Sequence, residues 1–311
     1  MKVPDKGVLL DIGKGSIATI SLFVAYMIIP VVGLMPGVYA PLPAMYYTIK
    51  SGRGVGLTIM LITVALLVVI SNPMITMLYL IQGGLISVTL PHFLLKGYGG
   101  LRSIVTGVAI NIACLLLIAL IAWQYYGQNV NQIVVKWIDT SISEATAMYD
   151  KSGLKKEDIL SLQQETKQVI GRIYPSLAIV AMGVIAGLNL QALRKLAAKL
   201  GRPFALTDLN AFRNPEHFIW FVIIPGFALL INNAGVVTAA LNILLVALSL
   251  YFIQGLAVVL SMFDKFAVPR FIRVTFYVVL VLQPFLAAGL AALGVFDLWG
   301  NFRVPRQRKN L

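Results

Sequence analysis

The chain has 311 residues, of which 59% are hydrophobic and only 12% charged, and its mean hydropathy is +0.87. A soluble domain has about a quarter of its residues charged, so this composition excludes an ordinary soluble protein and indicates helices that cross a membrane. The net charge of +13 lies mostly in short loops beside apolar runs, where Lys and Arg mark the cytoplasmic side, so we expect no nucleic-acid binding.

The first 126 residues are expected to form an N-terminal bundle of membrane helices. Apolar runs predict helices over about residues 16–34, 54–71, 73–95 and 104–126. Between the first two, Pro36, Pro41 and Pro43 each remove a backbone donor and exclude a regular helix. Irregular backbone at membrane depth is tolerated only where it is buried in protein or lines a wet cavity. We therefore interpret this stretch as the access region of a binding site.

Residues 127–172 form one soluble insert, which contains six of the twelve acidic residues. Its apolar residues recur at helical spacing, at Val130, Ile133, Val134, Trp137, Ile138 and Ile142. A second amphipathic helix is predicted over residues 155–170. Alternation of the membrane crossings places this helical hairpin on the extracytoplasmic side. It is either a cap that packs on the membrane domain, or a lid or partner-docking element.

The C-terminal part, residues 173–302, is predicted to contain further membrane helices over about residues 174–190, 218–231, 236–262 and 274–293. After nine crossings the basic tail, residues 303–311, would lie outside the cell. Either Pro284 breaks the last helix into a re-entrant pair, or one crossing is not real. The expected fold is an all-α, polytopic transmembrane bundle of eight or nine membrane helices with one extramembrane hairpin. Its expected location is the bacterial cytoplasmic membrane, with the lipid bilayer as its first partner.

Motifs that would carry enzyme chemistry are missing from the sequence. There is no G-x-x-x-x-G-K-[ST], no H-E-x-x-H and no G-x-S-x-G. Two histidines and one cysteine make a zinc site improbable. No pair of acids lies within an apolar helix, as a proton relay usually requires. We therefore expect no enzyme, no metal and no cofactor.

The candidate ligand-binding residues are uncharged amides inside the predicted membrane helices: Gln82, Asn111, Asn232, Asn233 and Gln254. An amide at this depth needs a hydrogen-bond partner, either across a helix interface or on a bound solute. Several such residues together predict a polar interior and a small uncharged or zwitterionic solute.

A basic segment follows the helix predicted over residues 174–190. Leu190, Leu193, Ala197 and Leu200 form an apolar stripe, with Arg194, Lys195 and Lys199 beside it. This pattern is typical of a helix at the inner-leaflet surface or against a membrane-protein partner. Further along, Arg213 and Glu216 are three residues apart, and we expect them to pair where Pro215 begins the next helix. These five charged residues are the predicted contacts to a partner or to the membrane surface.

Four segments in the second half carry a family resemblance: Phe212–Trp220, Tyr251–Val259, Pro269–Arg273 and Asp297–Arg303. With them the chain resembles the YybS-like family of bacterial membrane proteins, which supplies no catalytic residues. The N-terminal pattern of Pro30, Pro36-Gly, Pro41-Leu-Pro43 and Lys50–Gly56 is similar to S components of energy-coupling-factor vitamin transporters. That similarity implies binding of a small molecule within a helical bundle, energised by separate ATPases and a coupling subunit. The hairpin and the extra helices depart from a six-helix S component.

Two functional hypotheses follow from the sequence. The first is a small-molecule binding or transport subunit without its own ATPase, on the basis of the proline-rich access region and the interior amides. The alternative is a non-enzymatic scaffold or assembly protein of the cell envelope, with the basic helix and the hairpin as docking surfaces. A membrane enzyme ranks third, because it would need a cluster of polar residues that the sequence does not reveal.

Overall fold

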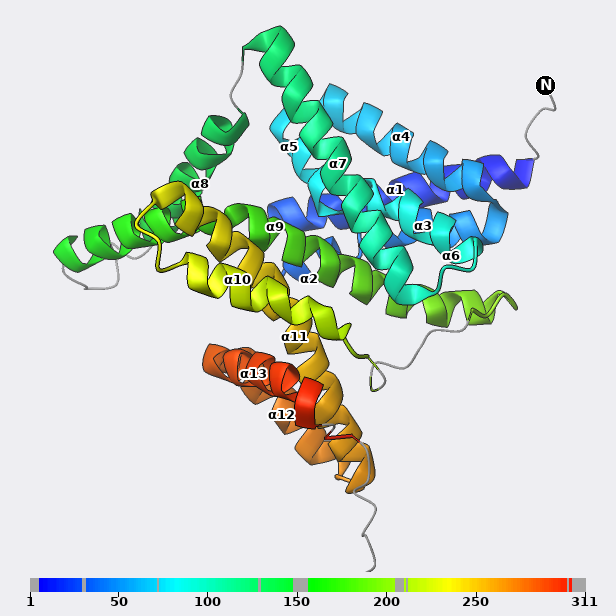
Figure 1. Cartoon of the computed structure of the whole chain (residues 1–311). Helices are drawn as coiled ribbons and strands as arrows, with labels where there is room; N and C mark the ends of the chain where they lie inside the picture. The colour runs from blue at the N-terminus through cyan, green and yellow to red at the C-terminus, as the bar shows by residue number, and fades with distance from the viewer. Residues whose placement is uncertain are drawn as a thin grey trace, which may run out of the picture. The chain divides into compact units, whose positions relative to one another are not determined.

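The computed structural model describes residues 6–29, 32–71, 73–127, 130–147, 156–204, 210, 212–300 and 302–303. The described residues are helical, with short connections and no strand, which confirms the all-α fold (Figure 1). The chain divides into two compact units. The first contains Met1–Lys167 and Ala178–Leu206, and the second contains Gln168–Leu177 and Thr207–Leu311. The predicted hairpin turn and the basic tail beyond Arg303 lie outside the described residues.

The first unit begins with α1 (Lys6–Ile28), α2 (Leu34–Val38), α3 (Leu42–Ser51) and α4 (Arg53–Ile70). Small residues let α1, α3 and α4 pack closely. A Cβ at Gly15 would lie 2.3 Å from Cδ1 of Ile59, and one at Gly56 would lie 2.9 Å from the carbonyl oxygen of Ala44. The proline-rich stretch is divided between the short helix α2 and the start of α3, with a turn between them.

The helix predicted over residues 73–95 is interrupted. The structure has α5 (Pro73–Tyr79), a π-helical turn η1 (Leu80–Gly84) and α6 (Ile86–Leu95), followed by α7 (Gly100–Tyr126). A Cβ at Gly83 would lie 2.4 Å from Cγ of Pro41, so only glycine permits this approach. The interruption in this helix therefore packs directly on the interruption between α2 and α3. Pi-helical turns of this kind are frequent at functional sites.

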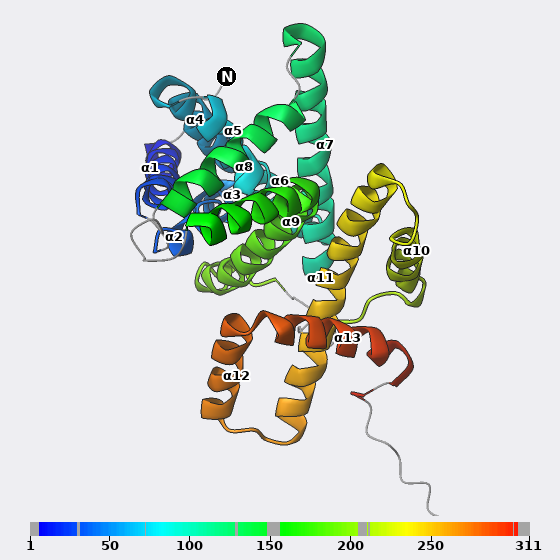
Figure 2. The same cartoon turned by 90° about the vertical axis from the view of Figure 1, so that its left-hand side faces the viewer.

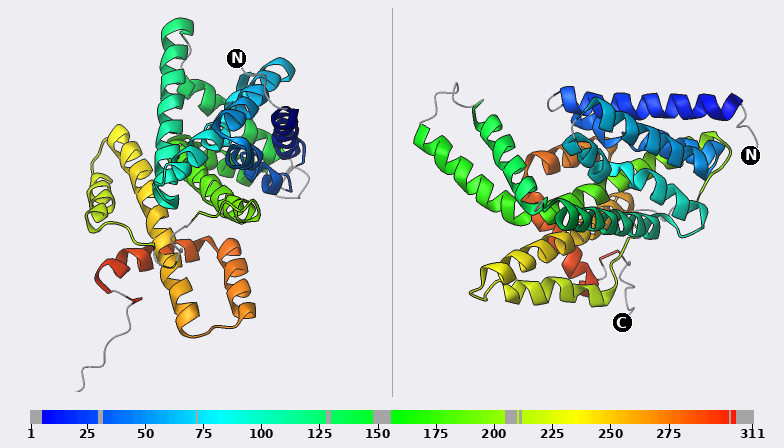
Figure 3. Two further views of the ribbon diagram at one scale, coloured as in Figure 1. Left: turned by 90° about the vertical axis from the view of Figure 1, so that its right-hand side faces the viewer. Right: turned by 90° about the horizontal axis from the view of Figure 1, so that it is seen from above.

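The hairpin insert consists of α8 (Val130–Ala147) and the start of α9 (Lys156–Lys199) (Figure 3, right). Gln163 Nε2 donates to Ser143 Oγ at 2.8 Å, and Ile138 and Ile159 are buried. The two separate helices expected over residues 155–170 and 174–190 form one helix of 44 residues. At 1.5 Å per residue α9 is about 66 Å long, roughly twice the thickness of the hydrocarbon core. Part of it therefore extends beyond a bilayer.

Pro175 lies within α9 and does not end it. In the second unit, the side-chain amide of Asn242 forms hydrogen bonds to two backbone groups of α9 beside the proline. Asn242 Nδ2 donates to the carbonyl of Arg172 at 2.8 Å, and its Oδ1 accepts from the N–H of Ser176 at 2.9 Å. An undisturbed helix would join these two backbone groups to each other. A neighbouring side chain satisfying the backbone in this way allows a membrane helix to continue through proline.

The rest of the second unit contains a 3₁₀ turn η4 (Glu216–Ile219), α10 (Trp220–Ala228), α11 (Ala234–Lys265), α12 (Arg270–Leu282) and α13 (Pro284–Gly300). Helices α11 and α12 run antiparallel, and α13 crosses α11 (Figure 2). The helix expected over residues 274–293 is broken before Pro284, with a bend of 110° between α12 and α13. Of the two alternatives that the sequence left open for this region, a break of the last helix at Pro284 is therefore the one present.

Six helices of the described chain are long and apolar enough to cross a membrane, or seven if the bent pair α12 and α13 counts as one span. The six are Lys6–Ile28, Arg53–Ile70, Ile75–Leu95, Gly100–Tyr125, Ile159–Lys199 and Ala234–Lys265. These helices support a multi-pass membrane protein, but they do not confirm the eight or nine spans expected. One difference is the apolar run over residues 218–231, because its helix, Glu216–Ala228, is too short for a regular span.

Candidate functional site

A cavity of about 220 Å³ lies in the first unit, where the two helix interruptions meet. Its lining comes from α1, α2, the α5–η1 segment and α9: Tyr26, Leu34, Val38, Leu78, Ile81, Gln82, Ala178, Ala181, Met182 and Ile185. Most of these side chains are apolar and none is charged. The lining is therefore that of a pocket for a small molecule held mainly by apolar contact.

Gln82 is the amide side chain in this lining. It lies in the π-helical turn, and its Oε1 is buried without a hydrogen-bond partner in the described part of the chain. A buried acceptor without a partner costs free energy, and a ligand hydroxyl or N–H would remove that cost. The structure thus places Gln82, one of the predicted ligand-binding residues, in a cavity with an unused acceptor.

A second amide, Asn189, fixes two walls of the cavity. Its Nδ2 donates to the carbonyl of Val38 at 2.7 Å and to the carbonyl of Ile185 at 2.8 Å. Val38 and Ile185 both line the cavity, so Asn189 ties α2 to α9 beside it. Asn189 is fully buried, and its role is that of a positioning residue.

Asn111 is also fully buried, in the middle of α7, but it does not line this cavity. Neither its Nδ2 nor its Oδ1 has a hydrogen-bond partner among the described residues. Asn232 and Asn233 lie in the exposed connection before α11. There Asn233 Oδ1 accepts from the N–H groups of Gly235 and Val236 at 2.9 and 3.1 Å, as a helix N-cap does. The structure does not bring these three residues together with Gln82.

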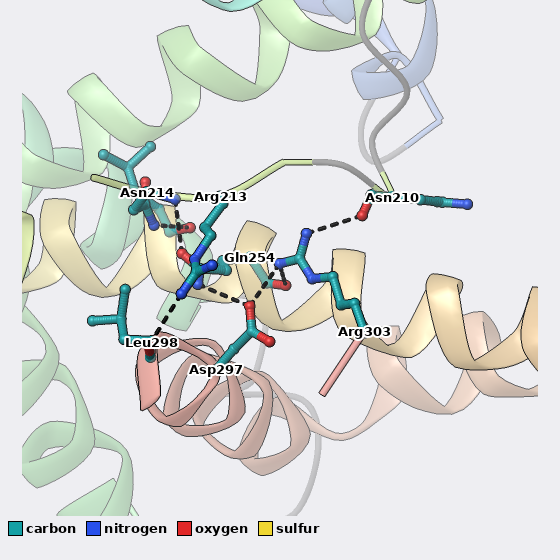
Figure 4. Close-up of polar contacts among 8 residues, drawn as sticks. Asn210, Arg213, Asn214, Gln254, Asp297, Leu298 and Arg303 are labelled. Atoms are coloured by element: carbon teal, nitrogen blue, oxygen red, sulfur yellow. Dashed lines mark hydrogen bonds and ion pairs between the residues drawn. The ribbon is translucent and has the colours of Figure 1, made fainter. Parts of the chain in front are cut away.

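Gln254, the last of the predicted amides, lies in a buried polar cluster of the second unit (Figure 4). Its Oε1 accepts from the N–H of Asn214 at 2.9 Å, and its Nε2 donates to Asp297 Oδ2 at 3.1 Å. Arg303 Nη2 donates to the same carboxylate oxygen at 2.9 Å. A buried ion pair is stable only when hydrogen bonds satisfy its remaining atoms, and Gln254 supplies one of them.

Arginine side chains extend this polar cluster to backbone carbonyls. Arg303 Nη1 donates to the carbonyl of Asn210 at 2.9 Å, and Arg213 Nη2 donates to the carbonyl of Leu298 at 3.1 Å (Figure 4). Arg213 was expected to pair with Glu216, but its guanidinium bonds the end of α13 instead. The cluster thus holds the chain segments before η4 and after α13 against α11.

The polar cluster depends on a close crossing of α11 and α13. A Cβ at Gly255 would lie 1.8 Å from the carbonyl oxygen of Leu290, and one at Gly294 would lie 1.9 Å from that of Tyr251. Glycine at both positions therefore lets the two backbones touch. Asp297 was not among the residues predicted to form a site. A lone acid inside an apolar run, six residues before an arginine, was the signal available for it.

The basic end of α9 belongs to the first unit. Leu190, Leu193 and Ala197, predicted to face a membrane surface or a partner, are buried in the unit's own core against α3, α6 and α7. Their burial corrects that interpretation of the stripe. Arg194, Lys195 and Lys199 remain exposed beside it, which leaves their predicted surface contacts open.

At the nearby end of α3, Lys50 Nζ and Ser51 Oγ bond the two carboxylate oxygens of Asp11, at 2.6 and 2.5 Å. The bond to Asp11 raises the pKa of Lys50. This pair ties the start of α1 to α3. It also explains why α1 begins ten residues before its predicted start, since Asp11 is buried in the packing of the bundle.

No group of three or more His, Cys, Asp or Glu side chains that could hold a metal ion occurs in the described residues. Among the described residues, the candidate chemistry therefore consists of an apolar cavity with one unused acceptor and a buried ion pair. The carboxylate of that pair also accepts from Gln254, while Arg303 Nε has no hydrogen-bond partner in the described part of the chain. The first arrangement can bind a ligand, and the second holds helices together.

Comparison with known proteins relates this chain to a family of predicted membrane proteins. Residues 17–298 match a family described as "Predicted membrane protein (DUF2232)". The "Uncharacterized protein YybS" of Bacillus subtilis (strain 168) is 24% identical over 297 residues, which cover 92% of this chain and 93% of that protein. The resemblance to the YybS-like family is thereby confirmed, while the resemblance to S components stays a prediction. No solved structure matches the chain.

Proposed function

Because the chain belongs to the DUF2232 family of predicted membrane proteins, we propose that it is a multi-pass protein of the bacterial cytoplasmic membrane that binds a small molecule. The binding site is the cavity between α1, α2, the α5–η1 segment and α9. The observation that carries the proposal is the buried, unpartnered Oε1 of Gln82 in an otherwise apolar lining.

The lining defines the chemical class of the ligand. A charged group would be buried without a counter-charge, because no lining residue is charged, and that burial is costly. An apolar molecule with one hydroxyl or N–H donor would match both the walls and Gln82. Its size is limited as well, because about 220 Å³ is below the usual range for drug-sized ligands. We therefore narrow the expected uncharged or zwitterionic solute to a small uncharged one.

A transport role extends this proposal. The sequence contains no P-loop, so the energy for transport would come from a separate protein. In that form the chain is the binding subunit of a larger assembly. Its helix interruptions at the cavity are where such a subunit would rearrange to release the solute, because hinges lie where elements end and glycine adopts backbone angles that other residues avoid.

The test is recovery of the ligand from the protein purified in native lipid particles, with small molecules extracted and identified by mass spectrometry. We expect one compound to be enriched, and Gln82→Leu to weaken its binding about fivefold, the value of one hydrogen bond. Ala178→Phe should remove it by filling the cavity. Asn232→Leu, which also replaces an amide by leucine but at an exposed position, is the control. No enriched compound, or equal retention by all variants, would refute the proposal.

A scaffold of the cell envelope is the second candidate, and the hairpin favours it. Trp137 on α8 and Leu160 on α9 are 45% and 61% exposed. Both lie on the hairpin, which would extend beyond the bilayer because α9 is longer than the membrane is thick. Exposed apolar residues on an extramembrane element are typical of a docking surface. The same purification decides between the two functions. Stable envelope-protein partners that are lost on Trp137→Ser, together with an empty cavity, would favour the scaffold.

A further inference from the structure

A second hollow in the first unit is a groove of about 260 Å³ between α3 and the last turns of α9. It is lined by Leu42, Pro43, Tyr46, Tyr47, Leu196 and Lys199. None of these residues lines the cavity proposed above. Apolar and aromatic side chains make up most of the groove, and one cation joins them. Its lining is thus amphipathic, with a single positive group.

Lys199 has a charge available for a bound anion. Lys50 on α3 donates to Asp11 at 2.6 Å and lies 5.4 Å from the centre of the Tyr47 ring, so its charge is already balanced. In the described part of the chain, no ion pair involves Lys199, which is exposed. Lys195, one turn earlier on α9, is exposed too and adds to the positive potential.

The walls of the groove are held in place before anything binds. On the α9 side, Leu193 and Ala197 are fully buried in the core of the unit, which fixes the orientation of Leu196 and Lys199. On the α3 side, the Tyr46 and Tyr47 rings pack edge to face at 5.1 Å. Arg202, just after α9, donates to the carbonyl of Ile49 at the end of α3. A preformed groove binds with little ordering cost.

The position of the groove along the chain is that of a membrane interface. Tyrosine and lysine side chains gather where the hydrocarbon core meets the headgroups, and a basic segment follows the apolar part of α9. Basic segments mark the cytoplasmic leaflet, which is rich in anionic lipids. An anionic lipid combines an apolar chain with a negative phosphate, and the groove combines an apolar wall with a lysine.

We propose that the groove between α3 and α9 binds one anionic phospholipid. An acyl chain lies along Leu42, Pro43 and Leu196, and the headgroup phosphate pairs with the Lys199 ammonium. The bound lipid covers the apolar groove and fills the space between α3 and the end of α9.

Native mass spectrometry of the purified full chain, with phosphatidylglycerol or phosphatidylcholine added at equal concentration, tests this proposal. We expect one phosphatidylglycerol molecule to bind per chain, with higher affinity than phosphatidylcholine. Lys199→Glu should lower its affinity at least fivefold, as expected for a lysine near an anionic lipid. The matched control is Lys96→Glu, which makes the same charge change at an exposed lysine of the same unit that does not line the groove. Equal losses in the two variants, or equal binding of the two lipids, would overturn the proposal.

A photo-crosslinking experiment identifies the occupant in cells. A benzophenone amino acid at position 196 should form an adduct with the mass of a phospholipid, and Lys199→Glu should reduce its yield. An adduct with the mass of a protein would show that the groove holds a polypeptide, which would also overturn the proposal. The benzophenone variant and Lys199→Glu must each keep the unfolding midpoint of the unchanged protein, so that loss of the fold is distinguished from loss of the lipid.

Discussion

Gly294→Ala tests the close crossing of α11 and α13 on which the buried ion pair depends. The new Cβ would lie 1.9 Å from the carbonyl oxygen of Tyr251 and 2.8 Å from the N–H nitrogen of Gly255. Both obstructing atoms belong to the backbone, so a rotamer change cannot relieve the overlap. The two helices would have to separate by roughly 1.5 Å at the crossing to restore ordinary contact distances.

The free-energy cost of this separation can be estimated from two contributions. Overpacking a helix contact costs about 1–3 kcal/mol. Moving α13 away also stretches the bond from Gln254 Nε2 to Asp297 Oδ2, already 3.1 Å, beyond hydrogen-bonding distance. Loss of a hydrogen bond to a charged group adds about 1.5–3 kcal/mol. We expect a total loss of about 3–5 kcal/mol, and an unfolding midpoint lower by roughly 10 °C.

Thermal unfolding in detergent micelles, followed by tryptophan fluorescence, measures this loss. Gly289→Ala is the matched control, because it lies on the same helix and its Cβ would meet nothing within 4 Å. We expect the control to leave the midpoint unchanged or to raise it, since alanine favours a helix over glycine. If Gly294→Ala and Gly289→Ala unfold at the same temperature, the two backbones do not touch at Gly294 and the reasoning fails.

Two further predictions concern buried polar groups, and both are measured by denaturant unfolding in micelles. Asn111→Leu should stabilise the protein by about 1–3 kcal/mol, because it removes a fully buried amide with two unpartnered atoms. A lower stability would contradict this and show that a polar ligand or water satisfies Asn111. Asp297→Asn should cost about 3–5 kcal/mol, since it leaves the mostly buried Arg303 without its counter-charge. Asp264→Asn, which breaks the more exposed pair with Arg273, should cost under about 1 kcal/mol. Equal losses of stability in Asp297→Asn and Asp264→Asn would refute the claim that burial makes the Arg303 pair more costly to break.

The candidate site could be predicted from the sequence only as a set of residue types. Gln82, Asn233 and Gln254 are all amides near apolar runs, and the sequence assigns them one role. In the structure Gln82 lines a cavity, Asn233 caps a helix and Gln254 bonds Asp297. The difference arises because each partner comes from another part of the chain, through a helix crossing that local pattern does not specify. Asp297 was missed for the same reason, since its partners Gln254 and Arg303 become neighbours only on folding.

Helix boundaries show the same division between local and distant causes. The sequence alone determined that the chain is helical, apolar enough for a membrane and interrupted near Pro41, because a helix satisfies its backbone within its own segment and proline acts on its own turn. It left the break at Pro284 as one of two alternatives. Only the tertiary structure decided that α9 continues through Pro175, because the amide that satisfies its backbone is Asn242, 66 residues away. It likewise decided that Gly83 meets Pro41 and that a cavity lies beside them, since packing between helices depends on contacts that no stretch of sequence contains.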